Sequence, residues 1–227
     1  MTPYYEHAGI TIYCGDCREV LGGGSVKAAL LCTDPPYGIG AARHKFGGHG
    51  VKQHHTGLAA GKMIAKRDYG DGAWDDSPPD AELIDLIRSC APYQIIFGGN
   101  YFQLPPSKCW LVWDKLRGNT DFADCELAWT NLNKAVRRIA YRWNGFLVQP
   151  GCKDVRTHPT QKPQDVMRWA ILQAPDTCKS VLDPFMGSGT TLEAAKALGL
   201  SAIGIEREER YCEIAAQRLS QEMLITV

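Results

Sequence analysis

Asp34, Pro35, Pro36 and Tyr37 are the residues of this sequence whose order points most directly to chemistry. They follow the apolar run 28–33, which predicts a buried strand that ends at the ligand-binding edge of an α/β sheet. Proline has no N–H, so the Pro35 carbonyl and the Asp34 carboxylate can both act as acceptors at one point. Two such acceptors suit the two protons of an exocyclic amine on a flat ring, and Tyr37 offers a face on which that ring could stack. The structural alternative is a strand followed by a plain Pro-Pro turn.

A second candidate site lies near the other end of the chain. Residues 180–191 predict a strand, a glycine turn and the start of a helix, which Gly199 stops. A further strand over 201–205 ends at Glu206, about 20 residues after the glycines, where an acidic side chain is placed to bind a ribose diol. Leu192 stands where a dinucleotide fingerprint requires a third glycine. This half of the chain therefore predicts a site for a nucleoside cofactor of another kind.

Three motifs together carry a resemblance to a known family. The run 183–189, Asp-Pro-Phe-Met-Gly-Ser-Gly, looks like the S-adenosylmethionine loop of amino-group DNA methyltransferases. With residues 34–37 ahead of it and His-Pro-Thr-Gln-Lys-Pro at 158–163 just before it, the chain closely resembles the beta group of those enzymes, in which the catalytic motif precedes the cofactor motif. The resemblance covers nearly the whole chain, and three motifs in the expected order are far more specific than one.

The resemblance implies a fold, a cofactor and a substrate. The expected fold is α/β: a single methyltransferase domain over 1–227 of the class I (Rossmann-like) type, with a mostly parallel twisted sheet, helices on both faces and permuted motif order. The expected cofactor is S-adenosyl-L-methionine, and the expected partner is double-stranded DNA from which one base is flipped. Asp34 and the glycine turn near Gly187 must then face each other across one cleft.

The same resemblance assigns the site residues. A Gly-Asp turn near the N-terminus would receive the adenine end of the cofactor through Asp16, for which helix capping is a compatible structural role. Thr160 and Lys162 would hold the methionine carboxylate of the cofactor. The expected catalytic residues are Asp34, Pro35, Pro36 and Tyr37, and the expected cofactor-binding residues are Asp16, Cys17, Asp34, Thr160, Lys162, Asp183, Phe185, Gly187, Ser188, Gly189, Thr190 and Glu206.

Positive charge is segregated, although the formal net charge is zero. The segment 43–67 carries lysines, arginines and histidines and no acidic residue, and the segment 134–156 carries basic residues against only Asp154. Either segment alone fits a solvated face, but two of them beside one predicted active edge favour contact with phosphates. The expected DNA-binding residues are Arg43, Lys45, Lys52, Lys66, Arg67, Arg137, Arg138 and Arg142.

Two segments are expected to serve DNA recognition. Residues 40–72 lack helix or strand periodicity, and we expect them to form a mobile DNA-facing loop that closes over the flipped base. Residues 131–157 occupy the usual place of a target-recognition segment, here reduced and basic, with Tyr141, Trp143 and Phe146 interleaved. A short recognition segment predicts either relaxed specificity or completion by a partner subunit, such as a second copy in a homodimer.

Several strands should deliver further residues to the same edge. The runs 94–97, 109–115 and 125–129 each read as a strand that finishes near the catalytic edge of a mostly parallel sheet. Trp113, Asp114 and Lys115 would then line the base pocket; a core tryptophan beside a surface ion pair is the alternative.

Composition bears on disulfides, metal binding and membrane association. The nine cysteines are scattered through predicted strands and helices, as expected of reduced and mostly buried thiols. Cys14 and Cys17 form one C-x-x-C without a second pair, so we expect no metal. No apolar run is long enough to cross a bilayer and no secretory leader is evident, which predicts a cytoplasmic protein without a membrane partner.

The function expected from the sequence is methyl transfer to N6 of adenine in DNA. Methylation of N4 of cytosine is the alternative, because it uses the same amine chemistry. In the N4-cytosine enzymes serine is commoner than aspartate at the place of Asp34, so Asp34 favours adenine. Structured RNA and a protein glutamine amide are further amino-group targets. A catalytically idle DNA-binding or regulatory protein with the same fold is the alternative from another class.

Overall fold

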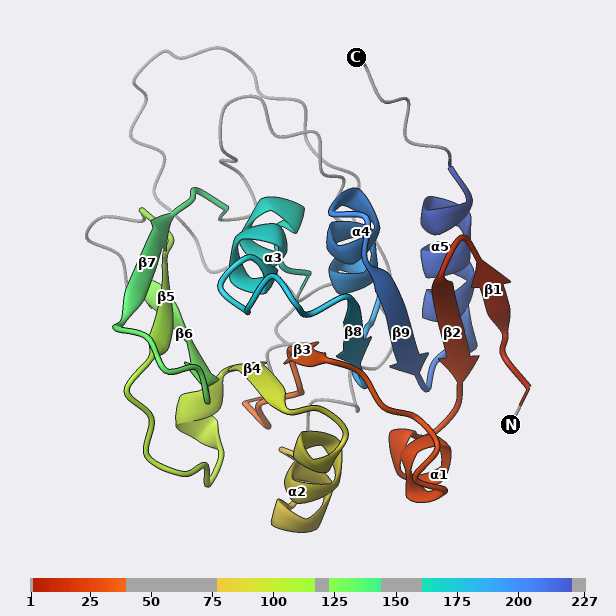
Figure 1. Cartoon of the computed structure of the whole chain (residues 1–227), viewed down its shortest axis with the longest axis horizontal. Helices are drawn as coiled ribbons and strands as arrows, with labels where there is room; N and C mark the ends of the chain where they lie inside the picture. Colours follow the sequence, from red (N-terminus) through yellow and green to blue (C-terminus); the bar gives the residue numbers. More distant parts are fainter. Residues whose placement is uncertain (1, 40–76, 117–122, 144–160, 222–227) are drawn as a thin grey trace, which may run out of the picture.

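The computed structural model describes residues 2–39, 77–116, 123–143 and 161–221. These residues form a sheet in the strand order β1-β2-β9-β8-β3-β4-β6-β5-β7, flanked by helices (Figure 1). The strands are β1 (Tyr5–His7), β2 (Ile10–Cys14), β3 (Leu30–Thr33), β4 (Tyr93–Phe97), β5 (Trp110–Asp114), β6 (Cys125–Thr130), β7 (Arg137–Ala140), β8 (Ser180–Asp183) and β9 (Ser201–Glu206). The helices are α1 (Cys17–Gly22), α2 (Ala81–Ser89), α3 (Gln164–Ile171), α4 (Thr190–Ala197) and α5 (Glu209–Ser220).

The sheet is mostly parallel, as the sequence predicted. Strands β2, β9, β8, β3 and β4 run in one direction, because each neighbouring pair among them is parallel. Strand β6 is antiparallel to both β4 and β5, so β5 returns to the common direction, and β1 is antiparallel to β2. The carboxyl ends of the parallel strands therefore share one edge of the sheet.

The chain changes its direction of travel across the sheet between β3 and β8. The strand that follows β3 is β4, on one side, whereas the strand that follows β8 is β9, on the other. In open α/β sheets the crevice at such a switch point is the place where ligands bind. The residues directly after β3 and β8 are therefore the first to consider for function.

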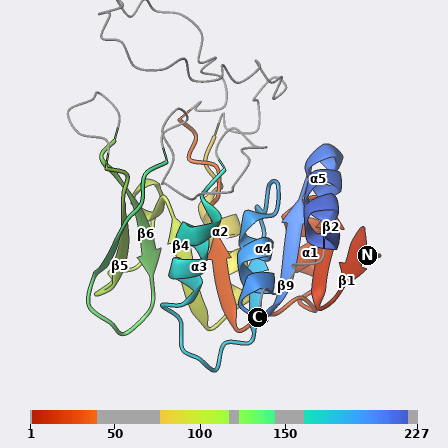
Figure 2. The same cartoon turned by 90° about the horizontal axis from the view of Figure 1, so that it is seen from above.

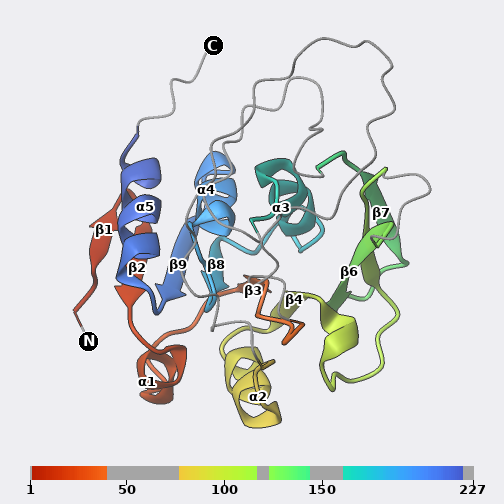
Figure 3. The same ribbon diagram turned by 180° about the vertical axis from the view of Figure 1, so that it is seen from behind.

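Both faces of the sheet are covered by helices, as expected for the class I methyltransferase fold (Figures 2 and 3). Alternate residues of β3 enter different cores, with Leu30 and Cys32 on one face and Leu31 on the other, because side chains alternate along a strand. The first core includes buried residues of α3, α4 and α5, and the second includes those of α1 and α2. Within the described ranges, no helix has the length and apolar character needed to cross a bilayer.

One expectation about the strands is wrong. Residues 125–129 do form a strand, but β6 runs against its neighbours, so it begins at the edge where β4 and β5 finish. The residues near its start, and not those near its end, therefore approach the ligand-binding edge. Glu126 is the second residue of this strand.

Candidate active site

Strands β3 and β8 deliver two carboxylates to the switch point. Asp34 directly follows β3, and Asp183 is the last residue of β8. The Thr33 hydroxyl donates a 2.6 Å hydrogen bond to Oδ1 of Asp183, which ties the two strand ends together. Both motifs that the sequence singled out thus lie at the same point of the sheet.

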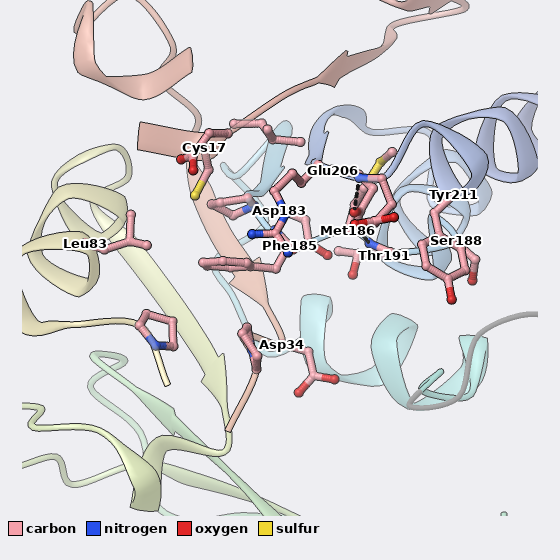
Figure 4. A pocket seen from close by; sticks show the side chains of 18 of the residues that line it. Cys17, Asp34, Leu83, Asp183, Phe185, Met186, Ser188, Thr191, Glu206 and Tyr211 are labelled. Atoms are coloured by element: carbon pink, nitrogen blue, oxygen red, sulfur yellow. Dashed lines mark hydrogen bonds between the residues drawn. The ribbon is translucent and has the colours of Figure 1, made fainter. Parts of the chain in front are cut away.

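A single cavity connects the two motifs. It has a volume of about 530 Å³ and is lined by Asp34 on one side and by the glycine turn, including Phe185 and Gly187, on the other. In Figure 4, Phe185 and Asp183 lie between Asp34 and Glu206. The sequence expectation that Asp34 and Gly187 face one cleft agrees with this geometry.

Most of the residues expected to bind a cofactor line this cavity. Among the expected catalytic residues, Asp34 and Pro36 belong to the lining, whereas Pro35 and Tyr37 stand beside it. Thr160 lies outside the described residues, and Gly189 shapes the turn without lining the cavity. The expected cofactor residues in the lining are Asp16, Cys17, Asp34, Lys162, Asp183, Phe185, Gly187, Ser188, Thr190 and Glu206.

The glycine turn is held in shape by hydrogen bonds to its backbone. Gly187 and Gly189 have φ values of +52° and +84°, a left-handed region that suits glycine. The Gly187 N–H donates to Oε2 of Glu206 at 3.1 Å, and the Phe185 N–H donates to Oδ1 of Asp183 at 3.1 Å. From the other side, Arg218 donates to the Ser188 carbonyl at 2.6 Å. The turn is therefore a preformed cradle.

Burial perturbs the acids of the cavity. It raises the pKa of Asp183 to about 6, against the opposing effect of hydrogen bonds from Thr191, Thr33 and the Phe185 N–H. Burial likewise raises the pKa of Glu206, although its carboxylate accepts the backbone N–H groups of Glu208 and Gly187. Clusters of buried acids with shifted pKa values are typical of ligand sites.

Asp16 combines the two roles considered for it. Its side chain accepts the Arg18 N–H at 2.8 Å and caps the first turn of α1. It also lines the cavity beside Cys17, whose thiol pKa burial raises to about 11. A capping aspartate and a neutral thiol thus form one wall of the pocket.

Both oxygens of the Asp34 carboxylate are engaged. The Tyr37 hydroxyl donates to Oδ1, and the Lys162 ammonium donates to Oδ2 at 2.5 Å. Burial raises the pKa of Asp34, while the positive charge of Lys162 acts in the opposite direction. Lys162, which was expected to hold the carboxylate of a cofactor, lines the cavity and forms ion pairs with Asp34 and Glu126.

Glu126 is a site residue that sequence reasoning missed. Its Oε2 lies 3.0 Å from Nζ of Lys162, and its Oε1 lies 2.5 Å from Nζ of Lys115. Burial alone would raise the pKa of Glu126, but the two lysines outweigh it and lower that pKa to about 2. An acid inside an otherwise apolar strand was the signal in the sequence that could have identified it.

The Tyr37 ring already has aromatic neighbours. It stacks on Tyr101 with a centroid distance of 4.9 Å and an interplanar angle of 13°, and it meets the edge of Phe102 at 6.4 Å. Gly98 is also close to the ring, and a side chain at this position would collide with it. The ring is therefore held in a narrow slot beside the carboxylate.

Trp113, Asp114 and Lys115 were expected either to line a base pocket or to be a core tryptophan beside a surface ion pair, and the three residues differ in this respect. Trp113 is a core residue, 2% exposed, and its indole N–H donates to the Tyr141 carbonyl at 2.8 Å. Asp114 forms an ion pair with the exposed Arg138 at 2.6 Å. Lys115 is buried and reaches the site through Glu126. Of the three residues, only Lys115 is therefore connected with Asp34, through Glu126 and Lys162.

The segment expected to recognise a target sequence is described only in part. Residues 131–143 include β7, which pairs in parallel with β5 at the end of the sheet and exposes Arg137 and Arg138. Arg142 is exposed, whereas Tyr141 and Trp143 are buried in the core and do not present a stacking surface. The loop at 40–72, the rest of 131–157 and the expected DNA-binding residues Arg43, Lys45, Lys52, Lys66 and Arg67 lie outside the described residues.

Comparison with known proteins gives the family. The sequence model of a family described as DNA methylase, the N6/N4 methyltransferase group, matches residues 103–217, just over half of the chain. This chain belongs to that DNA methylase family. The matched range contains Glu126, Lys162 and the glycine turn, and it begins after Asp34.

Curated relatives of this methylase match over shorter stretches. The type II methyltransferase M2.LlaDCHI of Lactococcus lactis subsp. cremoris is 43% identical over 79 residues, which is 35% of this chain and 29% of that protein. M2.DpnII of Streptococcus pneumoniae is 44% identical over 80 residues, 35% of this chain and 30% of its own length. M.HinfI of Haemophilus influenzae is 47% identical over 66 residues, 29% of this chain and 18% of its own length. The methylase thus matches less than a third of each of these relatives.

Solved structures share the fold of this chain. The M1.HpyAVI–SAM complex superposes with a TM-score of 0.56 at 23% identity, covering 93% of this chain and all of that one. The cytosine-N4-specific PvuII DNA methyltransferase superposes with a TM-score of 0.55 at 16% identity, covering 99% of this chain and 90% of that one. At these identities the likeness concerns the fold alone.

Among the described residues of the methylase, no group of three or more His, Cys, Asp or Glu side chains is arranged to hold a metal ion.

Proposed function

We propose that this methylase transfers a methyl group from S-adenosyl-L-methionine to N6 of an adenine flipped out of double-stranded DNA. The observation that carries the proposal is the cavity that joins Asp34 to the glycine turn at Phe185–Ser188. Membership of the DNA methylase family supports the same reaction class.

The cavity suits a nucleoside cofactor in size and in the nature of its walls. Its volume of about 530 Å³ lies within the range of roughly 300–1,000 Å³ typical of ligand pockets. The buried Glu206 carboxylate at the end of β9 has the position of a ribose-binding acid, and the glycine turn lets a ligand approach its backbone closely. When bound, S-adenosylmethionine supplies an electrophilic methyl group on a sulfonium sulfur.

The chain positions the nucleophile. Asp34 and the Pro35 carbonyl accept the two protons of the exocyclic amine, which directs the nitrogen lone pair toward the cavity. Oδ1 of Asp34 becomes available when the Tyr37 hydroxyl releases it, since the other oxygen is held by Lys162. The face of the Tyr37 ring opposite Tyr101 stacks on the flipped base. Orientation of the amine supplies most of the rate, because the methyl group on a sulfonium sulfur is already activated for transfer. No covalent adduct with the enzyme is required.

Adenine is proposed over cytosine on the identity of residue 34. Aspartate at this position is commoner in enzymes that modify adenine, and serine is commoner in those that modify N4 of cytosine. The N4-cytosine reaction uses the same two acceptors and is the second candidate. Analysis of the nucleosides of the modified DNA by mass spectrometry distinguishes N6-methyladenine from N4-methylcytosine directly.

The test is transfer of a tritiated methyl group to unmethylated DNA. The wild-type protein should label DNA, and Asp34→Ala should bind S-adenosylmethionine with an affinity near that of the wild type while turnover is lost. Asp176→Ala, an exposed aspartate in the loop before β8, is the matched control and should keep full activity. Near-normal turnover of Asp34→Ala would contradict the assignment, and absence of labelling by the wild type would contradict the function.

A second copy of the chain would supply further DNA contacts. The segment expected to recognise a target sequence, residues 131–157, is short, and its Arg138 is paired with Asp114. We propose that the protein grips duplex DNA as a homodimer. Sedimentation velocity with and without a DNA duplex tests this, and a single copy per duplex at saturation would rule it out.

A further inference from the structure

Four buried charges form a continuous network behind the catalytic carboxylate. The ammonium of Lys162 lies 2.5 Å from Oδ2 of Asp34 and 3.0 Å from Oε2 of Glu126. The other oxygen of Glu126 lies 2.5 Å from Nζ of Lys115. The side chain of Lys162 is only 7% exposed, and those of the other three groups are between 11% and 22% exposed. Two acids and two bases thus balance one another away from water.

Four separate elements build this network. Asp34 follows β3, Glu126 belongs to the start of β6, Lys115 follows β5, and Lys162 lies two residues before α3. The reversed direction of β6 is what brings Glu126 to this edge. Lys162 also lies 5.4 Å from the ring centre of Tyr37 and 5.5 Å from that of Phe97, so its ammonium has aromatic neighbours as well as carboxylates.

A network of this kind is a poor way to gain stability. Taking ions out of water costs several kcal/mol per ion by general estimates, and apolar residues of similar size are often equally stable in such positions. The position of the network therefore indicates a functional role, because Lys162 contacts Asp34, the carboxylate that the proposed reaction uses.

We propose that Lys162 and Glu126 are positioning residues for Asp34. Lys162 holds Oδ2, so that Oδ1 is the oxygen presented to the substrate amine, and Glu126 fixes Lys162 from behind. This inference rests on the proposed function, and it replaces the role in binding a cofactor carboxylate that the sequence resemblance implied for Lys162.

The two positioning residues act on Asp34 with opposite signs. Asp34 is an acceptor for the amine only while it is ionised. Burial raises the pKa of Asp34, the charge of Lys162 lowers it, and the charge of Glu126 raises it. Loss of Lys162 should therefore keep Asp34 protonated to higher pH, whereas neutralisation of Glu126 should let it ionise at lower pH.

Other ionisable groups face Asp34 in the described part of the chain, and they remain in place in both variants. Tyr37 lies on the same loop, Cys32 on β3 and Asp183 at the end of β8. These three groups are the same in both variants. Opposite shifts of the Asp34 pKa in the Lys162 and Glu126 variants would therefore come from the charge network and not from these groups.

The experiment compares pH profiles of single-turnover methyl transfer at saturating cofactor for Lys162→Met and Glu126→Gln. The acidic limb of the pH–rate profile of Lys162→Met should move to higher pH by about one unit or more. At pH values below this limb the rate should be at least tenfold lower than that of the wild type. The acidic limb of Glu126→Gln should move to lower pH. The controls Lys179→Met and Glu6→Gln, both exposed, should superpose on the wild type.

Cofactor affinity separates this role from the one expected from the sequence. Positioning of Asp34 predicts that Lys162→Met binds S-adenosylmethionine within about threefold of the wild type. A tenfold or greater loss of cofactor affinity with an unchanged acidic limb would overturn the proposal and return Lys162 to the cofactor site. In Lys162→Met, Glu126 keeps its ion pair with Lys115, so Asp34 is the acid that loses its charged partner. The conservative variant Lys162→Arg keeps the positive charge and guards against a fold lost through an unpaired buried acid; the acidic limb of its pH–rate profile should lie nearer to that of the wild type than to that of Lys162→Met.

A measurement on the free protein keeps the two proposals distinguishable. The carboxyl carbon of Asp34, labelled with ¹³C and identified through Asp34→Asn, reports its ionisation by NMR without DNA or cofactor. Its titration should move to higher pH in Lys162→Met and to lower pH in Glu126→Gln. If the wild type fails to methylate DNA while these shifts occur, the proposed function fails and the coupling stands; if the shifts are absent, the positioning role fails.

Discussion

Gly98→Ala should abolish most of the activity without disturbing the cofactor cavity. Gly98 follows β4 with a φ of +65°, and its N–H donates to the Leu127 carbonyl at 2.8 Å. A Cβ at this position would lie 2.1 Å from Cε1 of Tyr37, whereas ordinary contacts begin at 3.4 Å. The ring would therefore have to retreat by about 1.3 Å, the difference between these two distances.

The Tyr37 ring has little freedom to retreat. It is stacked on Tyr101, and its hydroxyl donates to Asp34. Because misplacement of a positioned group by about 1 Å can cost roughly 100-fold in rate, we expect turnover to fall by about two orders of magnitude. Neither Gly98 nor Tyr37 lines the cavity, so the affinity for S-adenosylmethionine should stay within about threefold of the wild type.

Gly24→Ala is the matched control. Gly24 has a φ of +68°, but nothing lies within 4 Å of the Cβ that it would carry. Both variants bear the backbone cost of a left-handed alanine, about 1–2 kcal/mol, and only Gly98→Ala meets the ring. Methyl transfer to DNA, cofactor binding by calorimetry and urea unfolding should be measured on both variants. Equal turnover of the two variants would refute the reasoning.

Two further predictions concern the acids of the cavity. Burial raises the pKa of Asp183 from 3.8 to about 6, so the folded state keeps this proton to higher pH than the unfolded state and stability is lost as the pH rises through this window. The free energy of unfolding of Asp183→Asn should therefore exceed that of the wild type at pH 7.5 by up to about 3 kcal/mol, at 1.36 kcal/mol per unit of pKa shift. Below pH 4 the variant should be no more stable than the wild type. An unchanged midpoint of urea unfolding at pH 7.5 would contradict this. Glu206→Ala removes the proposed ribose acceptor together with the carboxylate that holds the Gly187 N–H, so cofactor affinity measured by calorimetry should fall at least about tenfold while turnover at saturating cofactor stays within about threefold of the wild type; unchanged affinity would argue against a ribose at this position.

Much of the fold could be predicted from the sequence because the signals involved are local. The apolar run before Asp34 and the strand–glycine–helix pattern around Gly187 each specify their own backbone. Parallel strands end at a common edge, so two motifs that follow such strands lie at the same edge of the sheet. The resemblance to amino-group DNA methyltransferases added the expectation that Asp34 faces the glycine turn, and the pairing of β3 with β8 brings the two together.

The partners of individual charged residues could not be predicted in this way. Lys162 and Asp34 are 128 positions apart, and the residues next to either one in the sequence do not predict that the two form an ion pair. The sequence resemblance assigned Lys162 to a cofactor, whereas its ammonium lies between Asp34 and Glu126. Long flexible side chains take the partners that the tertiary packing offers, and the packing is set by residues elsewhere.

The sequence by itself determined that this is an α/β chain of the DNA methylase type, with the motif at 34–37 and the glycine turn at 185–189 each placed directly after a strand. The tertiary structure decided the direction of β6, since a strand has the same two-residue periodicity whichever way it runs. That direction places Glu126 beside Lys162, and so determines which charges surround Asp34. Local pattern specifies elements and the residues that they carry, and only the pairing of those elements specifies which charges meet out of water.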